Sequence, residues 1–255
     1  MNAPIAFLLS LTLLGPGLGF GFGPGSVAEL LGVQGPESAP AETKKKAPKA
    51  KEPAWRPDNA SEVLVLVQSF YDSADDLEAK FKQVYWNPTY GESRKTGGKL
   101  KLKKPGNMVW DYNDGQDADY YSNGTNLWMV EHDTRQVIKT DIEGNSEVNA
   151  ALKFLFGGQK LLKEFQVRYA KADKVERYGD ADHYVLQLRP KKDNKHYKGL
   201  LLIVHASTGR VDKFVVYNTD GSSNFFQLRG IKTNVGLNDK LFDFKVPRGY
   251  VETEE

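Results

Sequence analysis

The residue types that most often perform catalytic or metal chemistry are few in this chain and poorly spaced for it. There are four histidines, at positions His132, His183, His196 and His205. No two of them have the short spacing of a metal-binding pair such as H-E-x-x-H. Cysteine is absent, which excludes a thiol nucleophile, a thiolate metal site, a disulfide and a lipid-bearing N-terminal cysteine. We therefore predict no metal ion, no cofactor and no catalytic residue.

Carboxylates leave an alternative from another class open. Acidic residues such as Asp117, Asp119, Asp180 and Asp182 lie in predicted loops, where solvation is expected. No G-x-S-x-G nucleophile elbow occurs, and Gly157-Gly158 follows a predicted helix, which is the wrong order for a phosphate at a helix N-terminus. Because a catalytic carboxylate pair needs no local motif, an envelope enzyme with an unrecognised site remains an alternative.

Apolar and aromatic side chains form the larger candidate group. The chain has 13 Phe, 12 Tyr and 4 Trp residues, and many alternate with charged residues. In the clearest case, Leu100 and Leu102 share one face of a predicted strand, while Lys99, Lys101 and Lys103 share the other. Because the basic residues lie opposite the apolar ones, the pattern favours an apolar interior over a nucleic-acid platform.

Two helices and about eleven strands are predicted to position these side chains. The helices are predicted to begin near Ser61 and Ser146 as N-caps. Their apolar stripes contain Val63, Leu66, Val67 and Phe70 in the first, and Val148, Ala151, Leu152 and Leu155 in the second. The strands are predicted over residues 77–85, 99–103, 108–112, 119–122, 127–130, 136–142, 184–188, 199–205, 213–217, 225–228 and 242–246.

The spacing of these strands predicts a mainly β (α+β) fold with a single curved antiparallel sheet. Asn123-Gly124 is a hairpin turn signal between two of the strands. One face of the sheet is expected to be apolar and the other charged, as in sheets that meet water on one side. The helices are too few to cover the apolar face as a full second layer, so we expect an apolar hollow that they roof in part.

The N-terminal region is predicted to lie outside this domain. Residues 1–28 carry no charged side chain, contain the apolar run Ile5–Leu14 and end in the small-x-small pattern Ser26-Val27-Ala28, which is typical of a secretory signal peptide. Residues 29–57 are rich in Pro, Ala and Lys and are predicted to be a flexible tether. The folded domain is predicted over residues 58–255.

The charge of the chain argues against nucleic acid as a partner. The formal net charge is +2, and five lysines fall within residues 44–51 of the tether. Without those five the remaining residues carry about −3. A nucleic-acid-binding domain would be expected to carry a basic excess on its folded part.

Several ordered motifs resemble the periplasmic outer-membrane lipoprotein carrier family of the LolA type. The signature hairpin of that family is similar to Gly98-Lys-Leu-Lys-Leu-Lys-Lys-Pro-Gly-Asn-Met-Val-Trp110. Further similarities follow in Ser122–Trp128, in the helix through Leu155 with Lys163-Glu-Phe165, in Leu188-Arg-Pro190, in the hairpin of Thr208–Phe214 and Phe225–Leu228, and in Phe242–Gly249. Together they cover about residues 61–252.

This resemblance implies an unclosed β-barrel roofed by α-helices around a hydrophobic cavity for lipoprotein acyl chains. It implies a periplasmic chaperone that receives lipidated lipoproteins from an inner-membrane ABC transporter and passes them to an outer-membrane acceptor lipoprotein. The family has an Arg before the hairpin proline that contacts the lid. Here Lys104 takes that position and lacks the planar fork of Arg, so a differently held lid is expected.

The face assignments predict which residues line the cavity. From the strands these are Phe81, Leu100, Leu102, Met108, Trp110 and Trp128, and from the helices Leu66, Phe70, Leu152 and Leu155. The protein is expected to act as a monomer without nucleic acid. A lipid- or lipoprotein-sensing regulatory domain of the same fold is the closest alternative function.

Overall fold

The computed structural model describes residues 53, 56–113, 118–142, 161–193 and 197–254. Several predicted features lie outside these residues: the signal peptide, most of the tether, Asp117, His196, and the second predicted helix with Leu152 and Leu155. The helices are α3 (Ala60–Asp72), α5 (Leu161–Glu164), α6 (Ala172–Tyr178) and the 3-10 helix η2 (Asp239–Phe242). None of these described helices is long and apolar enough to cross a membrane.

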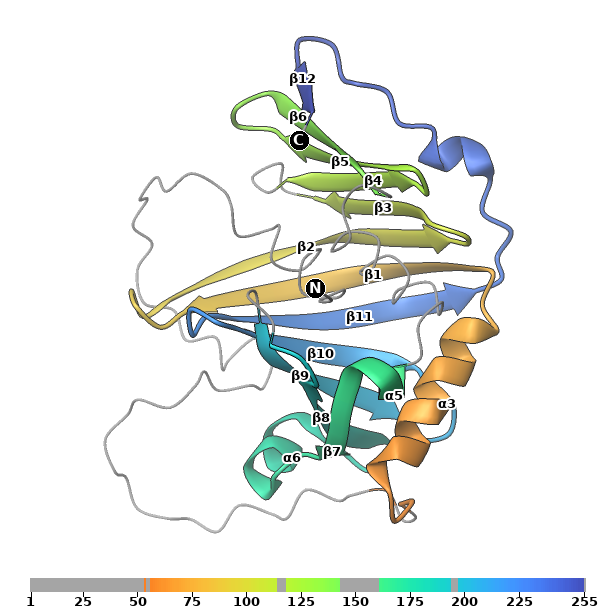
Figure 1. Ribbon diagram of the computed structural model, residues 1–255, viewed down its shortest axis with the longest axis vertical. Helices are drawn as coiled ribbons and strands as arrows, with labels where there is room; N and C mark the ends of the chain where they lie inside the picture. The colour runs from red at the N-terminus through yellow and green to blue at the C-terminus, as the bar shows by residue number, and fades with distance from the viewer. Residues whose placement is uncertain (1–52, 54–55, 114–117, 143–160, 194–196, 255) are drawn as a thin grey trace.

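Twelve strands form one sheet (Figure 1). They are β1 (Asp76–Asn87), β2 (Glu92–Lys103), β3 (Asn107–Tyr112), β4 (Asp119–Asn123), β5 (Asn126–Glu131), β6 (Gln136–Asp141), β7 (Phe165–Tyr169), β8 (His183–Pro190), β9 (Tyr197–His205), β10 (Val211–Asn218), β11 (Ser223–Thr233) and β12 (Val251–Glu254). Their order is β12-β6-β5-β4-β3-β2-β1-β11-β10-β9-β8-β7. The predicted mainly β, unclosed curved sheet is confirmed, with β12 and β7 as its edges.

The pairing is antiparallel throughout except at one edge. β12 pairs with β6 in parallel, from Val251 opposite Gln136 to Glu254 opposite Lys139. The segment between β11 and β12, residues 234–250, runs along one side of the sheet in Figure 1, and we call it the C-terminal strap. The prediction of a strand over 242–246 is wrong, because η2 ends at Phe242 and residues 243–246 belong to no helix or strand.

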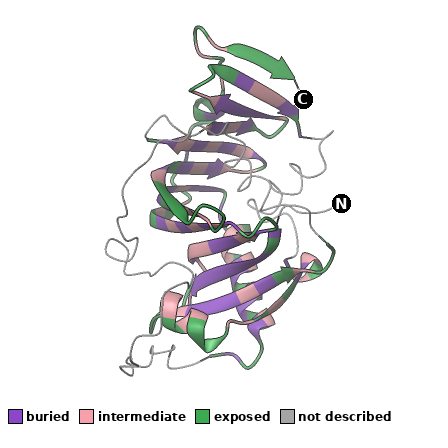
Figure 2. Ribbon diagram, turned by 90° about the vertical axis from the view of Figure 1, so that its left-hand side faces the viewer, coloured by how far each residue is buried: buried purple, intermediate pink, exposed green. Residues whose placement is uncertain are grey.

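One face of the sheet, which we call the inner face, carries the main core. Apolar side chains from β1 to β11 and from α3 form one buried cluster. Figure 2 shows buried residues alternating with less buried ones along several strands, as in β3, whereas the edge strand β12 is exposed throughout. This alternation is the period of two that a strand imposes on its side chains.

The other, outer face is not uniformly charged as predicted. The cluster of Val185, Leu201, Ile203 and Val215 on this face is packed against Val175 and Tyr178 of α6. A second cluster, Trp128, Val130 and Val137, is packed against Phe244 and Tyr250 of the strap. The outer face is therefore apolar in two places, and each place is covered by a segment whose position on the sheet the periodicity did not predict.

The N-cap of helix α3 lies two residues before the predicted one. The side chain of Asn59 accepts a hydrogen bond from the Ser61 backbone N–H at 2.8 Å, so Asn59 is the N-cap. The buried stripe is Ala60, Val63, Leu64 and Val67. Helix α3 lies against α5 and β7, at the opposite end of the sheet from β12 (Figure 1).

Candidate functional site

The structure brings together five of the six strand residues predicted to line the cavity. Phe81 comes from β1, Leu100 and Leu102 from β2, and Met108 and Trp110 from β3. All five lie in the main cluster, and none is more than 5% exposed. The strand register brings them together. Leu100 pairs with Trp110, and Leu102 pairs with Met108. Phe81 lies opposite Gly98, which is two residues before Leu100 and therefore on the same face of β2. The predicted shared face is therefore present.

Aromatic rings make up the centre of this face. The Phe81 ring centroid lies 5.3 Å from that of Trp110 and 4.9 Å from that of Tyr112. Trp110 lies 5.7 Å from Phe226, which stacks on Phe214 at 4.7 Å. Tyr112 and Phe226 were not among the predicted lining residues, although each continues the same alternation. The rings form a continuous apolar surface across five strands.

Of the helical candidates, one packs on this surface and one does not. Phe70 is partly buried against the main cluster. Leu66 is 41% exposed and is absent from the cluster. The predicted inward position of Leu66 is corrected, because the buried stripe of α3 runs through Leu64 instead. The apolar residues of the helix fit either stripe, which differ by a rotation about the helix axis.

Trp128 lies on the opposite face from the one predicted. Its ring lies 5.2 Å from that of Phe244 in the strap. Its neighbours Leu127 and Met129 belong to the main cluster instead. The run Leu127–Val130 is apolar at every position, so alternation could not decide its face, and a shift of one residue exchanges the two faces. The prediction for Trp128 is therefore corrected in favour of Leu127 and Met129.

A small polar group interrupts the apolar surface. The Tyr112 hydroxyl donates to Oε1 of Gln83 at 2.7 Å, and Nε2 of Gln83 donates to Oδ1 of Asn224 at 2.7 Å. Two further buried donors, Nε1 of Trp110 and Nδ2 of Asn224, have no hydrogen-bond partner in the described part of the chain. Each can donate to an oxygen atom of a bound molecule, which would remove the penalty of an unsatisfied buried donor.

Lys104 joins the β2–β3 hairpin to the end of α3. Its Nζ donates to the backbone carbonyl of Asp72, the last residue of α3, at 2.8 Å, and its backbone N–H donates to the Asp75 carbonyl at 2.9 Å. A positive charge at a helix C-terminus is favourable, because the terminal carbonyls carry a partial negative charge. Lys104 therefore fastens the C-terminal end of α3 to the sheet.

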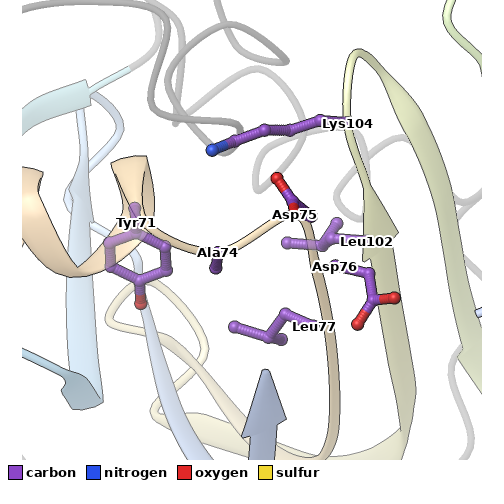
Figure 3. A pocket seen from close by; sticks show the side chains of 7 residues that line it. All are labelled: Tyr71, Ala74, Asp75, Asp76, Leu77, Leu102 and Lys104. Atoms are coloured by element: carbon purple, nitrogen blue, oxygen red, sulfur yellow. The ribbon is translucent and has the colours of Figure 1, made fainter. Parts of the chain in front are cut away.

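A small pocket lies at the same junction (Figure 3). It is lined by Tyr71, Ala74, Asp75, Asp76, Leu77, Leu102 and Lys104. Its volume of about 10 Å³ is about enough for one water molecule and too small for an acyl chain. A preformed cavity for acyl chains stays a prediction, whereas the apolar surface that would line it is present.

Asp76 ties the strap to the same junction. Its carboxylate accepts backbone N–H groups of Val235 and Leu237, both at 2.7 Å. Burial raises the pKa of Asp76, but the hydrogen bonds from the backbone of the strap and the charge of Lys103 outweigh it and leave the pKa below its ordinary value. Sequence reasoning missed this residue, because its partners lie about 160 positions away.

A charged network lies near the other side of the α3 C-terminus. His183 contacts Asp180 at 2.6 Å through Nδ1 and Asp212 at 3.0 Å through Nε2, and the guanidinium of Arg210 also pairs with Asp212. Tyr71 of α3 forms a hydrogen bond with the backbone of Val211, and burial raises its pKa. This network joins β8 to β10 through the contact between His183 and Asp212.

We expect this network to make the free energy of unfolding depend on pH. The hydrogen bond to Asp212 raises the pKa of His183 above its ordinary value of 6.5, against the opposing effect of burial. The stabilisation is therefore complete below that ordinary pKa and is lost as the pH rises through the raised pKa. Denaturant titrations across neutral and mildly alkaline pH should show this loss in the parent, and the His183→Gln variant should show a flatter profile. An equal slope in both proteins would contradict the assignment.

Comparison with protein families gives a match over most of the folded part. The family model described as "Outer membrane lipoprotein carrier protein LolA" matches residues 72–245. An outer-membrane lipoprotein carrier protein of Azotobacter vinelandii is 26% identical over 178 residues, which cover 70% of this chain and 81% of that protein. One of Methylococcus capsulatus is 27% identical over 188 residues, covering 72% and 83%.

The matches among solved structures are more distant in sequence. A putative outer membrane lipoprotein-sorting protein domain from Vibrio parahaemolyticus is 14% identical, with a TM-score of 0.42 over 72% of this chain and 97% of that chain. A LolA superfamily protein from Nitrosomonas europaea is also 14% identical, with a TM-score of 0.39 over 73% and 98%.

Proposed function

Because the chain belongs to the LolA family of outer membrane lipoprotein carrier proteins, we propose that it carries lipoproteins through the periplasm by holding their acyl chains on its inner face. The observation that carries this proposal is the continuous apolar and aromatic inner face, which contains Phe81, Trp110 and Phe226. Members of this family are carriers and not enzymes. The protein is therefore a binding chaperone that needs no catalytic residue.

The energetics of acyl chains explain why a carrier is required. Removing an acyl chain from water gains about 0.8 kcal/mol per CH₂ group, so a chain of about 15 methylenes gains about 12 kcal/mol. Free lipoproteins would leave a membrane too slowly without a protein that covers these chains. Release to an acceptor requires that the carrier bind no more strongly than the acceptor does. Apolar contacts with few hydrogen bonds meet that requirement, because they can be exchanged one at a time.

Loading requires the protein to open, because its inner face is covered in this structure. Inner-face side chains such as Met108 and Leu127 are almost completely buried, and the junction pocket is far too small for cargo. The cargo must therefore displace elements that cover this face. We assign the Lys104–Asp72 hydrogen bond as a latch that holds the end of α3 in the closed state. Its single ammonium donor is easier to break than the several donors of an Arg.

Partners follow from the same proposal. Cargo is expected to arrive from an inner-membrane ABC transporter and to leave to an outer-membrane acceptor lipoprotein. Export by the signal peptide of residues 1–28 would place the protein in the periplasm. The two unpartnered donors on the inner face, Nε1 of Trp110 and Nδ2 of Asn224, are available to the ester carbonyls of the lipid.

Purification of the protein from a cell envelope, followed by mass analysis of the bound material, tests the carrier function. We expect lipidated lipoproteins in the purified complex and their transfer to acceptor-containing membranes on mixing. A protein that binds lipoprotein but never transfers it, and that instead binds a membrane regulator, would support the sensing function. A protein purified without bound lipid under conditions that load a known carrier would contradict both.

The latch is tested by replacing Lys104. Lys104→Met keeps the apolar stem of the side chain and removes the donor to Asp72, so the closed, cargo-free state loses a stabilising contact and we expect cargo release to become slower while loading changes less. Lys104→Arg, which retains a donor, is the matched variant and should release cargo at the parent rate or faster. Transfer rates measured with a fluorescent lipoprotein give the comparison. Identical release by Met, Arg and Lys proteins would remove Lys104 from the mechanism.

A further inference from the structure

Basic side chains cover the middle of the outer face, between the part packed against α6 and the part packed against the strap. Their strands are β2, β1, β11 and β10, which are neighbours in the sheet. Most of them are exposed, and Lys101 and Lys213 are half-buried. We call them the basic patch, which consists of Lys80, Lys82, Lys95, Lys99, Lys101, Lys213, Arg229 and Lys232.

Strand register brings three of these cations into one row. Lys80 of β1 lies directly opposite Lys99 of β2 on one side and Arg229 of β11 on the other. Directly opposite residues point to the same face, with Cβ atoms about 5 Å apart. Like charges in this arrangement destabilise a sheet. A row of three therefore lowers the stability of the fold in the absence of a bound anion.

Few acidic residues neutralise the patch. Lys232 pairs with Glu78 at 3.0 Å, and Asp111 of β3 lies opposite Lys99. Lys80, Lys99 and Lys82 form no ion pair within the described part of the chain. The eight cations and these two carboxylates contribute +6, whereas the whole chain carries +2, so the rest of the chain carries −4. The positive charge is therefore concentrated on one face of an otherwise acidic protein.

The composition of the patch indicates the kind of anion that it meets. The cores of protein–protein interfaces are depleted of Lys and enriched in aromatic residues and Arg. The patch has seven lysines and one arginine, and none of the exposed large hydrophobic residues of the described chain belongs to it. The Lys side chain is a flexible point charge and lacks the planar fork by which Arg recognises a carboxylate or phosphate of fixed geometry. A patch made mainly of Lys therefore suits a diffuse anionic surface.

We propose that the basic patch docks the protein on the anionic headgroups of a phospholipid membrane. Each Lys or Arg near such a surface contributes an attraction that is sensitive to salt and falls off within a Debye length. Docking through the outer face leaves the inner face free. The protein could then remain close to the membrane surface while its inner face accepts or releases cargo. The docking itself requires no cargo.

Vesicle sedimentation with the exported protein tests this proposal. The parent should bind vesicles of phosphatidylglycerol mixed with phosphatidylcholine, bind pure phosphatidylcholine vesicles weakly, and dissociate as salt is added. The row is neutralised by Lys80→Gln, Lys99→Gln and Arg229→Gln, and the partition coefficient should then fall about 100-fold. Each cation near the membrane contributes about 1 kcal/mol, and every 1.4 kcal/mol corresponds to about a tenfold change. The variant should be as stable as the parent or more stable, because like charges are removed.

Two control proteins make the result specific. Lys171→Gln, Lys192→Gln and Lys245→Gln remove three exposed lysines outside the patch, with the same change in net charge, and should lower binding much less. A second control replaces the five tether lysines of residues 44–51 with glutamine. Equal losses in the row variant and the surface control, or complete loss in the tether variant alone, would overturn the proposal.

Two further measurements, of binding to an acidic protein and of cargo retention, also test the membrane proposal. Binding to an acidic protein with no binding to anionic vesicles would overturn the membrane proposal and assign the patch to a protein partner. Cargo retention by the row variant should equal that of the parent, because the inner face is untouched. Loss of vesicle binding with normal retention would therefore support docking, and failure of docking would leave the carrier function standing.

Discussion

Replacing Leu102 with glutamate is expected to abolish retention of a lipidated cargo. Leu102 is 5% exposed on the inner face, pairs with Met108 and lines the pocket at the α3 junction. A carboxylate there would be buried without a partner, which the protein can tolerate only by protonating it or by opening the site to water. The backbone hydrogen bonds of β2 are unaffected, so we expect a folded sheet whose free energy of unfolding falls by about 2–5 kcal/mol.

Co-purification of cargo and a denaturant titration measure the two effects. The matched control is Lys101→Glu, which places the same carboxylate on the same strand but on the outer face. It should retain cargo and change stability by less than about 1 kcal/mol. If Leu102→Glu does not fold, Leu102→Gln tests the same face with a neutral side chain. Normal retention by a folded Leu102→Glu protein would show that the inner face does not hold the acyl chains.

Removing the Asp76 carboxylate is expected to free the C-terminal strap from the sheet. Asp76→Ala removes the carboxylate that accepts the backbone N–H groups of Val235 and Leu237. The two N–H groups then lose their acceptor, and Lys103 loses a nearby negative charge. Hydrogen bonds to a charged group are each worth about 1.5–3 kcal/mol, so the free energy of unfolding should fall by about 3 kcal/mol or more. Limited proteolysis should then cut within residues 234–250 faster than in the parent.

Asp75→Asn provides the control for this change. Asp75 is the adjacent residue and is exposed, and its backbone rather than its carboxylate forms the hydrogen bonds of the junction. Its replacement should leave both stability and strap cleavage near the parent values. The parent should also lose stability as the pH falls toward the lowered pKa of Asp76, since a carboxyl with a depressed pKa stabilises only while ionised. Equal proteolysis of Asp76→Ala and the parent would refute the anchoring role.

Local periodicity was sufficient for most of the sheet. The alternation in Lys99–Lys103 and Met108–Tyr112 predicted both the strands and their faces, because a strand has a side-chain period of two and one face is buried. The turn at Asn123-Gly124 was likewise readable, and β4 and β5 flank it. The absence of cysteine and the lack of metal-ligand spacing directed attention away from catalysis and toward an apolar surface.

Predictions were wrong where the local pattern fits two arrangements. Leu127–Val130 is apolar at every position, so the inward face was chosen by long-range packing, which places Trp128 on Phe244 of the strap. The stripe of α3 could pass through Leu64 or Leu66, and contact with the sheet buried Leu64. Residues 242–246 of the strap were predicted to be a strand, but Phe242 is buried in η2 and Phe244 packs on Trp128.

The curved antiparallel sheet, its apolar face and the family could be predicted from the amino-acid sequence alone, because they follow from periodicities of two and from ordered motifs along the chain. Three features required the folded chain: the inward residue of an unbroken apolar run, the contact of Lys104 with the end of α3, and the row formed by Lys80, Lys99 and Arg229. The physical reason is that each of these features is a contact between segments far apart in the chain. Such contacts depend on strand order and register, which no local pattern contains.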